Sequence, residues 1–240
     1  MSAGLSITVD VDGAAGLPGG GAGYEHRLSR WSERTYGITR GLERILAVLE
    51  EFDVRATFYV PGITAERHPS EVAALAAGHE IGHHGHTHRS PHRLPADEQR
   101  REIEEGLSAL AALGLEPHGY RAPAWELTDV TLALLVEHRF AYDSSLMGDD
   151  RPYELSGLIE LPVHWALDDA PHFAHTTDPA GLLATWLTEL EAARSEGRHT
   201  TVTCHPEILG RAHRIDVLRR LLEEASQPCL THGDVARSLT

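Results

Sequence analysis

The chain has 240 residues, a hydrophobic fraction of 41% and a formal net charge of −15, from 21 basic and 36 acidic residues. This length and apolar content allow a sizeable core, and we expect a single domain over residues 1–240. So acidic a chain lacks the clustered positive charge that binding to nucleic acid or to an anionic membrane requires, and we expect neither partner.

The N-terminal sequence and the cysteines bear on the compartment. The first residues, MSAGLSITVDVDG, lack the basic start and the apolar run of a signal peptide. No segment approaches the roughly 20 apolar residues that a membrane span needs. Cys204 and Cys229 do not form a CxxC pair and suit a reducing compartment. We therefore expect a soluble cytoplasmic protein.

Strand-like and helix-like patterns alternate along the chain. Runs of β-branched and aromatic residues indicate strands, and apolar residues spaced three and four apart indicate helices. The Gly-rich stretch at residues 13–23 is interpreted as a long mobile loop. In chain order we predict a strand at residues 5–9, a helix at 39–51, a strand at 54–60, a helix at 69–78, a strand at 80–83, a helix at 95–113, a strand end at 119–121, a helix at 128–138, strands at 140–143 and 158–162, a helix at 179–195, a strand at 200–205, and helices at 214–225 and from 231 onward.

This alternation predicts parallel strands joined by crossover helices, and therefore an α/β fold. About seven repeats of the unit favour a closed or nearly closed barrel over an open sheet. Side chains able to do chemistry follow the predicted strands, at the edge where such folds place their functional sites. They are Asp10, Asp12, His84, His88, Arg121 and His205.

The tract His83-His84-Gly85-His86-Thr87-His88 is the most distinctive feature of the sequence. On a helical turn, the four-residue spacing of His84 and His88 places both imidazoles on one face, where they can share a cation. A solvated His-rich loop that binds metal adventitiously fits the same tract, as does a metal buffer that takes up several ions. Taken alone, the tract leaves these alternatives open.

Asp10 and Asp12 favour the metal site. Both point toward the same end of the sheet if the first strand has ended by Asp12. One carboxylate and two histidines are a common ligand set for a catalytic metal, and the second carboxylate can take a proton from water. The alternative for an acidic pair after a strand is a turn or a helix cap.

Arg121 and His205 complete the chemistry. A cation beside Asp10 keeps that carboxylate ionised next to another acid, and a guanidinium pairs well with a carboxylate. An imidazole that titrates near neutrality can protonate a leaving nitrogen. The alternatives are a surface ion pair for Arg121 and a core or capping role for His205.

In this order, the motifs resemble the polysaccharide deacetylase family, also called carbohydrate esterase family 4 or the NodB-homology family. The resemblance runs from about residue 5 to residue 235. The spaced acidic pair resembles the branch that holds allantoinase-like and cyclic-imide-hydrolase-like proteins. The matching motifs are Asp10-Val11-Asp12, His84 to His88, Arg121-Ala122-Pro123, Asp143-Ser144-Ser145 with Leu161 to Trp165, and Cys204-His205-Pro206.

The resemblance implies a distorted (β/α)7 barrel of the NodB-homology type. It implies that Asp10 is the general base and that one divalent metal is held by Asp12, His84 and His88. Zinc is the first expectation, although nickel, cobalt, iron or manganese also suit such ligands. Family analogues further imply a homo-oligomer.

Aromatic and acidic residues near the motifs are interpreted as follows. Trp125 and Trp165 flank family motifs and are expected to wall a substrate pocket, although aromatic residues more often belong to the core. Two acidic pairs are expected to be solvated loop residues. They are Asp149 with Asp150 and Asp168 with Asp169.

We therefore predict a hydrolase of carbon–nitrogen bonds that acts on a small cyclic imide or ureide-like amide in the cytoplasm. The expectation rests on the absence of an export signal and on the stretches at residues 144–150 and 160–169, which resemble the ring-amide branch. One alternative is N-deacetylation of an N-acetylated sugar or peptidoglycan fragment. Another is a non-catalytic metal-binding or carbohydrate-binding protein, which needs neither a base nor an acid.

Overall fold

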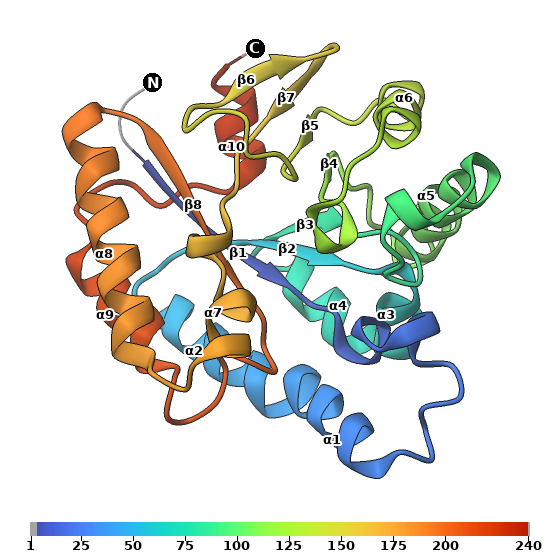
Figure 1. Ribbon diagram of the computed structural model, residues 1–240, viewed down its shortest axis with the longest axis horizontal. Coiled ribbons are helices and arrows are strands. Elements are labelled where there is room, and N and C mark those ends of the chain that lie inside the picture. Colours follow the sequence, from blue (N-terminus) through green and yellow to red (C-terminus); the bar gives the residue numbers. More distant parts are fainter. Residues whose placement is uncertain (1–3, 240) are drawn as a thin grey trace.

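A curled sheet forms the centre of the computed structural model, which describes residues 4–239 (Figure 1). Its strand order is β6-β7-β5-β4-β3-β2-β1-β8. All neighbouring pairs are parallel except β6 with β7, so seven parallel strands carry one antiparallel edge strand, which confirms the predicted distorted (β/α)7 barrel. The strands are β1 (Gly4–Asp10), β2 (Thr57–Val60), β3 (Glu80–His83), β4 (Gly119–Tyr120), β5 (Tyr142–Asp143), β6 (Tyr153–Leu155), β7 (Leu158–Glu160) and β8 (His199–Cys204).

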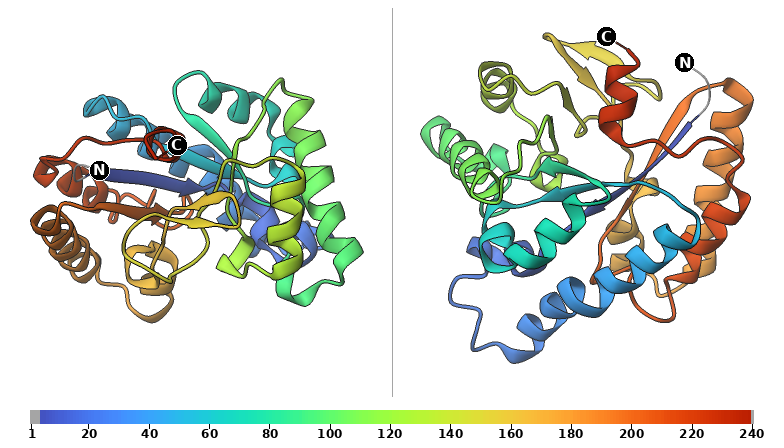
Figure 2. Two further views of the ribbon diagram at one scale, coloured as in Figure 1. Left: turned by 90° about the horizontal axis from the view of Figure 1, so that it is seen from above. Right: turned by 180° about the vertical axis from the view of Figure 1, so that it is seen from behind.

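Helices cover the outer side of the curled sheet, as the views from above and behind show (Figure 2). No helix within residues 4–239 is long and apolar enough to cross a lipid bilayer. A π-helical turn, Gly37–Gly41, joins the first two helices. The helices are α1 (Leu28–Tyr36), α2 (Leu42–Glu51), α3 (Gly62–Arg67), α4 (Pro69–Ala76), α5 (Ala96–Ala111), α6 (Asp129–Glu137), α7 (Asp169–His175), α8 (Pro179–Glu196), α9 (Asp216–Glu224) and α10 (His232–Arg237).

Strand β1 shows how the sequence divides the two faces of the sheet. Leu5, Ile7 and Val9 point outward into the main hydrophobic core, which includes side chains of α2, α8 and α9. The alternate residues Ser6 and Thr8 therefore point into the barrel, because successive strand side chains face opposite sides. Both are fully buried and hydrogen-bonded there. Asp10 continues this inner row to the end of the strand.

The barrel is not closed by strand pairing. Strands β7 and β8 lie at or next to the two ends of the sheet order and do not pair with each other within residues 4–239. The segment after β7 crosses the gap and meets β8 through a bridge between Asp168 and Thr203. This crossing carries Asp168 and Asp169 toward the end of β8, where His205 lies.

The segment at residues 13–23, predicted as a long mobile loop, has more local structure than that prediction implies. The segment forms two short 3-10 turns, Gly13–Gly16 and Pro18–Gly21, and much of it is buried. Arg34 and Arg67 donate hydrogen bonds to the carbonyl groups of Gly16 and Gly20. Glycine is used here for backbone shape, because Gly13 has a φ of +54° and lies against Ile38.

Candidate active site

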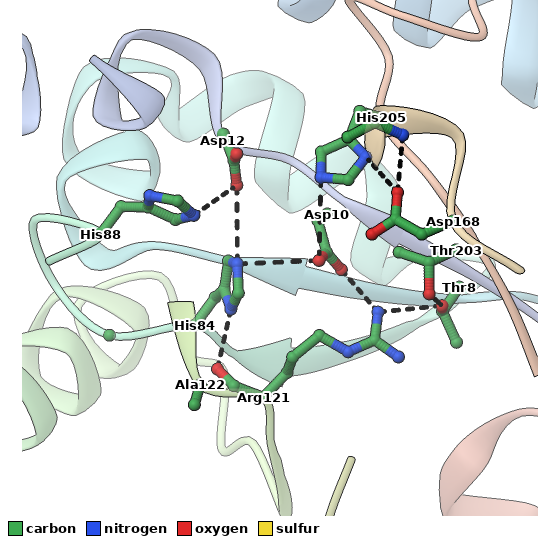
Figure 3. Close-up of polar contacts among 12 residues, drawn as sticks. Thr8, Asp10, Asp12, His84, His88, Arg121, Ala122, Asp168, Thr203 and His205 are labelled. Atoms are coloured by element: carbon green, nitrogen blue, oxygen red, sulfur yellow. Dashed lines mark hydrogen bonds and ion pairs between the residues drawn. The ribbon is translucent and has the colours of Figure 1, made fainter. Parts of the chain in front are cut away.

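The six predicted residues converge at the carboxyl ends of β1, β3, β4 and β8 (Figure 3). Asp10 is the last residue of β1, and Asp12 follows after the strand has ended. His84, Arg121 and His205 each come directly after a strand. The parallel order of the strands explains the convergence, since all these ends meet at one edge. The residues are Asp10, Asp12, His84, His88, Arg121 and His205.

Asp10 and Arg121 form a buried ion pair. The distance from Arg121 Nη1 to Asp10 Oδ1 is 2.7 Å, and Arg121 has no exposed surface. The same nitrogen donates to Thr8 Oγ1 at 2.9 Å. Removing either charge leaves the other buried and uncompensated, which is strongly destabilising. Arg121 is therefore not the surface ion pair that the sequence left open.

Further contacts fix the guanidinium of Arg121 in place. Its Nε donates to the carbonyl of Ser144 at 3.1 Å and its Nη2 to the Ser144 hydroxyl at 3.0 Å. The ring of Tyr59 lies 4.2 Å from the guanidinium carbon, at cation–π distance. The Asp10 charge outweighs burial and raises the pKa of Arg121. The cation beside Asp10 is thus permanent.

Asp12, His84 and His88 form a compact group of potential metal ligands. Asp12 Oδ1 lies 3.3 Å from His88 Nε2 and 3.6 Å from His84 Nε2. One ligand atom from each residue lies within 4.8 Å of the others. His84 Nδ1 donates to the carbonyl of Arg121 at 2.7 Å, which leaves the lone pair of Nε2 free to bind metal.

The two histidines lie on an irregular loop and not on the helical turn expected from their spacing. Gly85 has a φ of +71° and His88 a φ of +57°, so the chain doubles back between them. Glu102 of α5 holds the loop by accepting hydrogen bonds from the backbone N–H groups of His86 and Thr87, at 2.9 and 2.7 Å. The strained backbone of His88 is typical of functional sites.

The charge state of the group suits a metal. Burial lowers the pKa of His88 to about 4, so its imidazole is neutral at pH 7. Burial opposes the charged form of Asp12, but the basic groups that face it, chiefly His88 and His205, lower the pKa of this carboxyl below its ordinary range. Asp12 Oδ1 is buried and accepts no hydrogen bond from the described residues. An ionised oxygen without a donor, close to the Nε2 atoms of two imidazoles, fits a divalent cation.

Arg34 and Glu207 border the metal-ligand group on its other side. Arg34 Nη1 lies 3.9 Å from Asp12 Oδ2 and forms a closer ion pair with Glu207 Oε1. Burial raises the pKa of Glu207 to about 7 even though Arg34 opposes the shift. Neither residue was singled out from the sequence, because their pairing depends on the position of α1.

Asp168 and Asp169 were expected to be solvated loop acids, and this prediction is wrong. Both are buried beside His205. Asp169 Oδ1 accepts a hydrogen bond from His205 Nδ1 at 2.7 Å, and its Oδ2 accepts one from the His205 backbone N–H at 2.9 Å. Burial opposes the imidazolium, but the two carboxylates outweigh it and raise the pKa of His205 well above its ordinary value. His205 Nε2 faces Asp10 Oδ2 at 4.0 Å.

These three residues form a second group with metal-ligand spacing. Its oxygens are better satisfied than Asp12 Oδ1, because both oxygens of Asp169 are bonded to His205 and Asp168 Oδ1 accepts the backbone N–H of Ala170 at 2.7 Å. We therefore treat this group as an acid–imidazole pair, and the first group as the one that fits a metal.

Trp125 and Trp165 stack on one another beside the site, with ring centroids 4.5 Å apart and an interplanar angle of 25°. Trp125 is buried, whereas Trp165 is 46% exposed. Ala124 and Trp125 have positive φ values of 58° and 55°, so the loop after Arg121 is held in a strained conformation. The pair forms a flat apolar surface with an open edge.

A second buried acidic pair binds the residues that follow Ser144, and Ser144 in turn binds Arg121. Asp143 and Glu160 are register partners on β5 and β7 and are fully buried. Glu160 Oε1 accepts the backbone N–H groups of Ser145 and Leu146, and Asp143 Oδ1 accepts the Ser145 hydroxyl. Burial and the Asp143 charge raise the pKa of Glu160 to about 10. We therefore expect the pair to share one proton at pH 7, and its hydrogen bonds fix the residues next to Ser144.

Comparisons with known proteins identify relatives of the sequence and of the fold. The sequence profile described as polysaccharide deacetylase matches residues 35–142. A crystal structure of a candidate polysaccharide deacetylase from Mycobacterium smegmatis is 38% identical, with a TM-score of 0.91 over 99% of this chain and 90% of that chain. A peptidoglycan deacetylase of Helicobacter pylori is 25% identical over 93% of this chain and 90% of its own length. An allantoinase crystal structure shares the fold, with a TM-score of 0.84 at 22% identity over 98% of this chain and 89% of that chain.

The shared proton predicts how substitutions of Glu160 affect stability. Glu160→Gln keeps an acceptor for both N–H groups and a donor for Asp143, so its stability at pH 7 should equal or exceed that of the wild type. Glu160→Leu should lower the free energy of unfolding by roughly 3 kcal/mol, because two buried N–H groups lose their acceptor. Urea denaturation measures both, and equal destabilisation by the two substitutions would refute the shared proton.

The pH dependence gives an independent check on the same group. Glu160 is protonated in the folded chain up to a pKa of about 10, whereas its ordinary value is 4.5. Folding therefore takes up a proton between these values, and this group makes stability fall as pH rises through the window. Glu160→Gln should flatten that dependence.

Proposed function

Because the chain belongs to the polysaccharide deacetylase family, it is a metal-dependent hydrolase of carbon–nitrogen bonds other than peptide bonds, and we propose that it opens a small cyclic imide or ureide-like amide. In this proposal, Asp12, His84 and His88 hold one divalent ion, with zinc as the first candidate. Asp10 is the general base, His205 the general acid, and one domain over residues 1–240 carries the site.

One observation carries the assignment of the metal ligands. Asp12 Oδ1 is buried and without a hydrogen-bond donor in residues 4–239, at 3.3 and 3.6 Å from two imidazole nitrogens. Asp12, His84 and His88 would hold a divalent ion there, and the ion would supply polarisation of the scissile carbonyl and a more acidic water molecule. The three residues occupy only part of a coordination sphere, which leaves room for water and substrate.

The remaining residues divide the proton transfers between them. Asp10 accepts the proton of the attacking water, and Arg121 keeps the carboxylate ionised until then. The hydroxyl adds to the carbonyl carbon, the carbon–nitrogen bond breaks, and His205 Nε2 protonates the departing nitrogen. Asp169 holds the opposite nitrogen of His205 and favours the imidazolium that this step requires. His205 and Asp10 are close enough to act on one carbonyl group.

The substrate class rests on the loop motifs and on the two tryptophans. The spaced acidic pair and the stretches at residues 144–150 and 160–169 resemble the ring-amide branch of the family. The stack of Trp125 on Trp165 offers a flat apolar wall with an exposed edge, which suits a small planar ring.

A second candidate is N-deacetylation of a peptidoglycan sugar. It is favoured by the similarity to the Helicobacter pylori peptidoglycan deacetylase along nearly the whole chain. The same base, acid and metal ligands serve either amide, so the two candidates differ only in what binds around the site.

The same proposal includes a cytoplasmic location and a homo-oligomer. Cys204 and Cys229 are free thiols, which suit a reducing compartment. The oligomer is an analogy with the family.

Metal content tests the ligand set. Wild-type protein purified without an affinity tag should contain about one divalent ion per chain. The variant His84→Ala, His88→Ala should contain none, and the control His26→Ala, His118→Ala, which removes two exposed histidines, should retain it. Elemental analysis by mass spectrometry gives the ratios. Equal metal content in both variants would point to adventitious binding.

Asp10→Asn tests the base together with the substrate class. The variant should lose turnover by at least ~100-fold, because proton transfer from water has no acceptor, while it keeps its metal. The substrates to assay are a panel of cyclic imides and N-acetylated sugars. Wild-type turnover of N-acetylated oligosaccharides alone contradicts the ring-amide proposal. Wild-type rates in Asp10→Asn contradict the role of Asp10.

Asp169→Asn tests the acid. The carboxylates of Asp168 and Asp169 raise the pKa of His205. The imidazolium therefore persists above the ordinary histidine pKa and is lost only as pH rises through the raised pKa. Removing one charge should move the alkaline limb of kcat/KM to lower pH by roughly one unit. Asp149→Asn, at an exposed acid, is the matched control. An unchanged alkaline limb in Asp169→Asn would exclude His205 as the titrating acid.

A further inference from the structure

A hollow of about 500 Å³ lies between α7 and the chain that follows β8. It is bounded by α7, by the end of α1 and by the chain that follows β8. Ala170 lines it and follows Asp169, which binds His205. Glu207 lines it from the other side, two residues after His205. The hollow is thus lined by near neighbours in sequence of Asp169 and His205, and none of the mechanistic roles above uses it.

Two arginines of the hollow are held in place by aromatic rings. The guanidinium carbon of Arg211 lies 3.7 Å from the centroid of the Tyr36 ring, and that of Arg214 lies 3.8 Å from the Phe173 ring. Arg211 donates through Nε to the carbonyl of Glu207 at 3.1 Å, and Arg214 donates through Nη1 to Ile208 at 3.4 Å. These contacts use few of the guanidinium donors, so most remain available to a ligand.

Neither arginine has a carboxylate partner within 4.0 Å among residues 4–239. Arg214 Nε is also buried and without a hydrogen-bond acceptor there. Burial lowers the pKa of Arg214, although Asp169 opposes this shift. Each cation is thus pre-oriented by an aromatic ring and has no carboxylate partner within this range, which leaves it able to pair with an anion.

The acids that line the hollow do not supply this compensation. Glu207 is paired with Arg34, and Glu33 faces Arg30 at 3.7 Å. Arg211 and Arg214 are therefore the charged groups of the hollow left to meet an anion, in a chain whose formal net charge is −15. A local cationic site attracts anionic substrates, which the rest of the acidic surface repels.

We propose that Arg211 and Arg214 bind a carboxylate group carried by the substrate, so that the enzyme selects anionic amides over neutral ones. This inference rests on the proposed function, because the hollow is taken as part of the substrate site. Guanidinium groups suit the task, since their planar donors match both oxygens of a carboxylate. The aromatic stacking keeps the two cations oriented before the ligand arrives.

The test is binding of linear dicarboxylates with three to six carbons, compared with acetate, to the metal-loaded protein by calorimetry. Acetate reports the reaction centre alone, and a dicarboxylate of matching length reports the centre and the hollow together. At least one dicarboxylate should bind about tenfold more tightly than acetate. Arg211→Gln, Arg214→Gln should abolish this advantage and leave acetate binding unchanged. Arg220→Gln, at an exposed arginine of α9, is the control.

Thermal unfolding separates loss of binding from loss of folding, and Arg214→Lys, which keeps the charge, should retain part of the advantage. Dicarboxylates that bind no better than acetate, or equally well to the double variant, overturn the inference. A third outcome separates the two proposals. If the protein binds neither metal nor acetate but still binds dicarboxylates through the arginines, the proposed function is contradicted and the anion site is retained.

Discussion

The site is organised around the burial of several like charges. Asp10, Asp12, Asp168 and Asp169 all lie at the same end of the barrel with less than a tenth of their surface exposed. Carboxylates this close repel one another and lose hydration, so each needs a positive or donating partner. Asp10 has Arg121, and Asp169 has His205. Asp12 Oδ1 has no donor within residues 4–239, and this is the place where we propose the metal.

The support for these partners extends well beyond the site. Arg121 is fixed by Ser144, whose neighbouring residues are held by the acid pair of β5 and β7. His205 is fixed by Asp169, which reaches it only because the chain after β7 crosses the gap to β8. The incomplete barrel is therefore part of the chemistry, since closure by direct pairing of β7 and β8 leaves no room for this crossing.

Much of this was predictable from the sequence, for physical reasons. Strand and helix periodicity gave the parallel order, and that order brings Asp10, His84, Arg121 and His205 together without any further information. Helix α1 has no buried side chain and so lacks an apolar pattern that could have indicated it. Asp168 and Asp169 read as loop acids because their burial comes from β8, which is distant in sequence. The four-residue spacing of His84 and His88 predicted a helical turn. In the structure, positive φ values at Gly85 and His88 fold a loop instead, and this loop also brings the two imidazoles together.

The position of the metal is the most direct test of the account, because two groups in the structure have ligand spacing. Crystals grown with zinc and measured at its absorption edge would locate the ion by anomalous scattering. We predict one peak, bounded by Asp12 Oδ1 and by the Nε2 atoms of His84 and His88. A peak among Asp168, Asp169 and His205 instead would contradict the assignment of base, acid and metal ligands together.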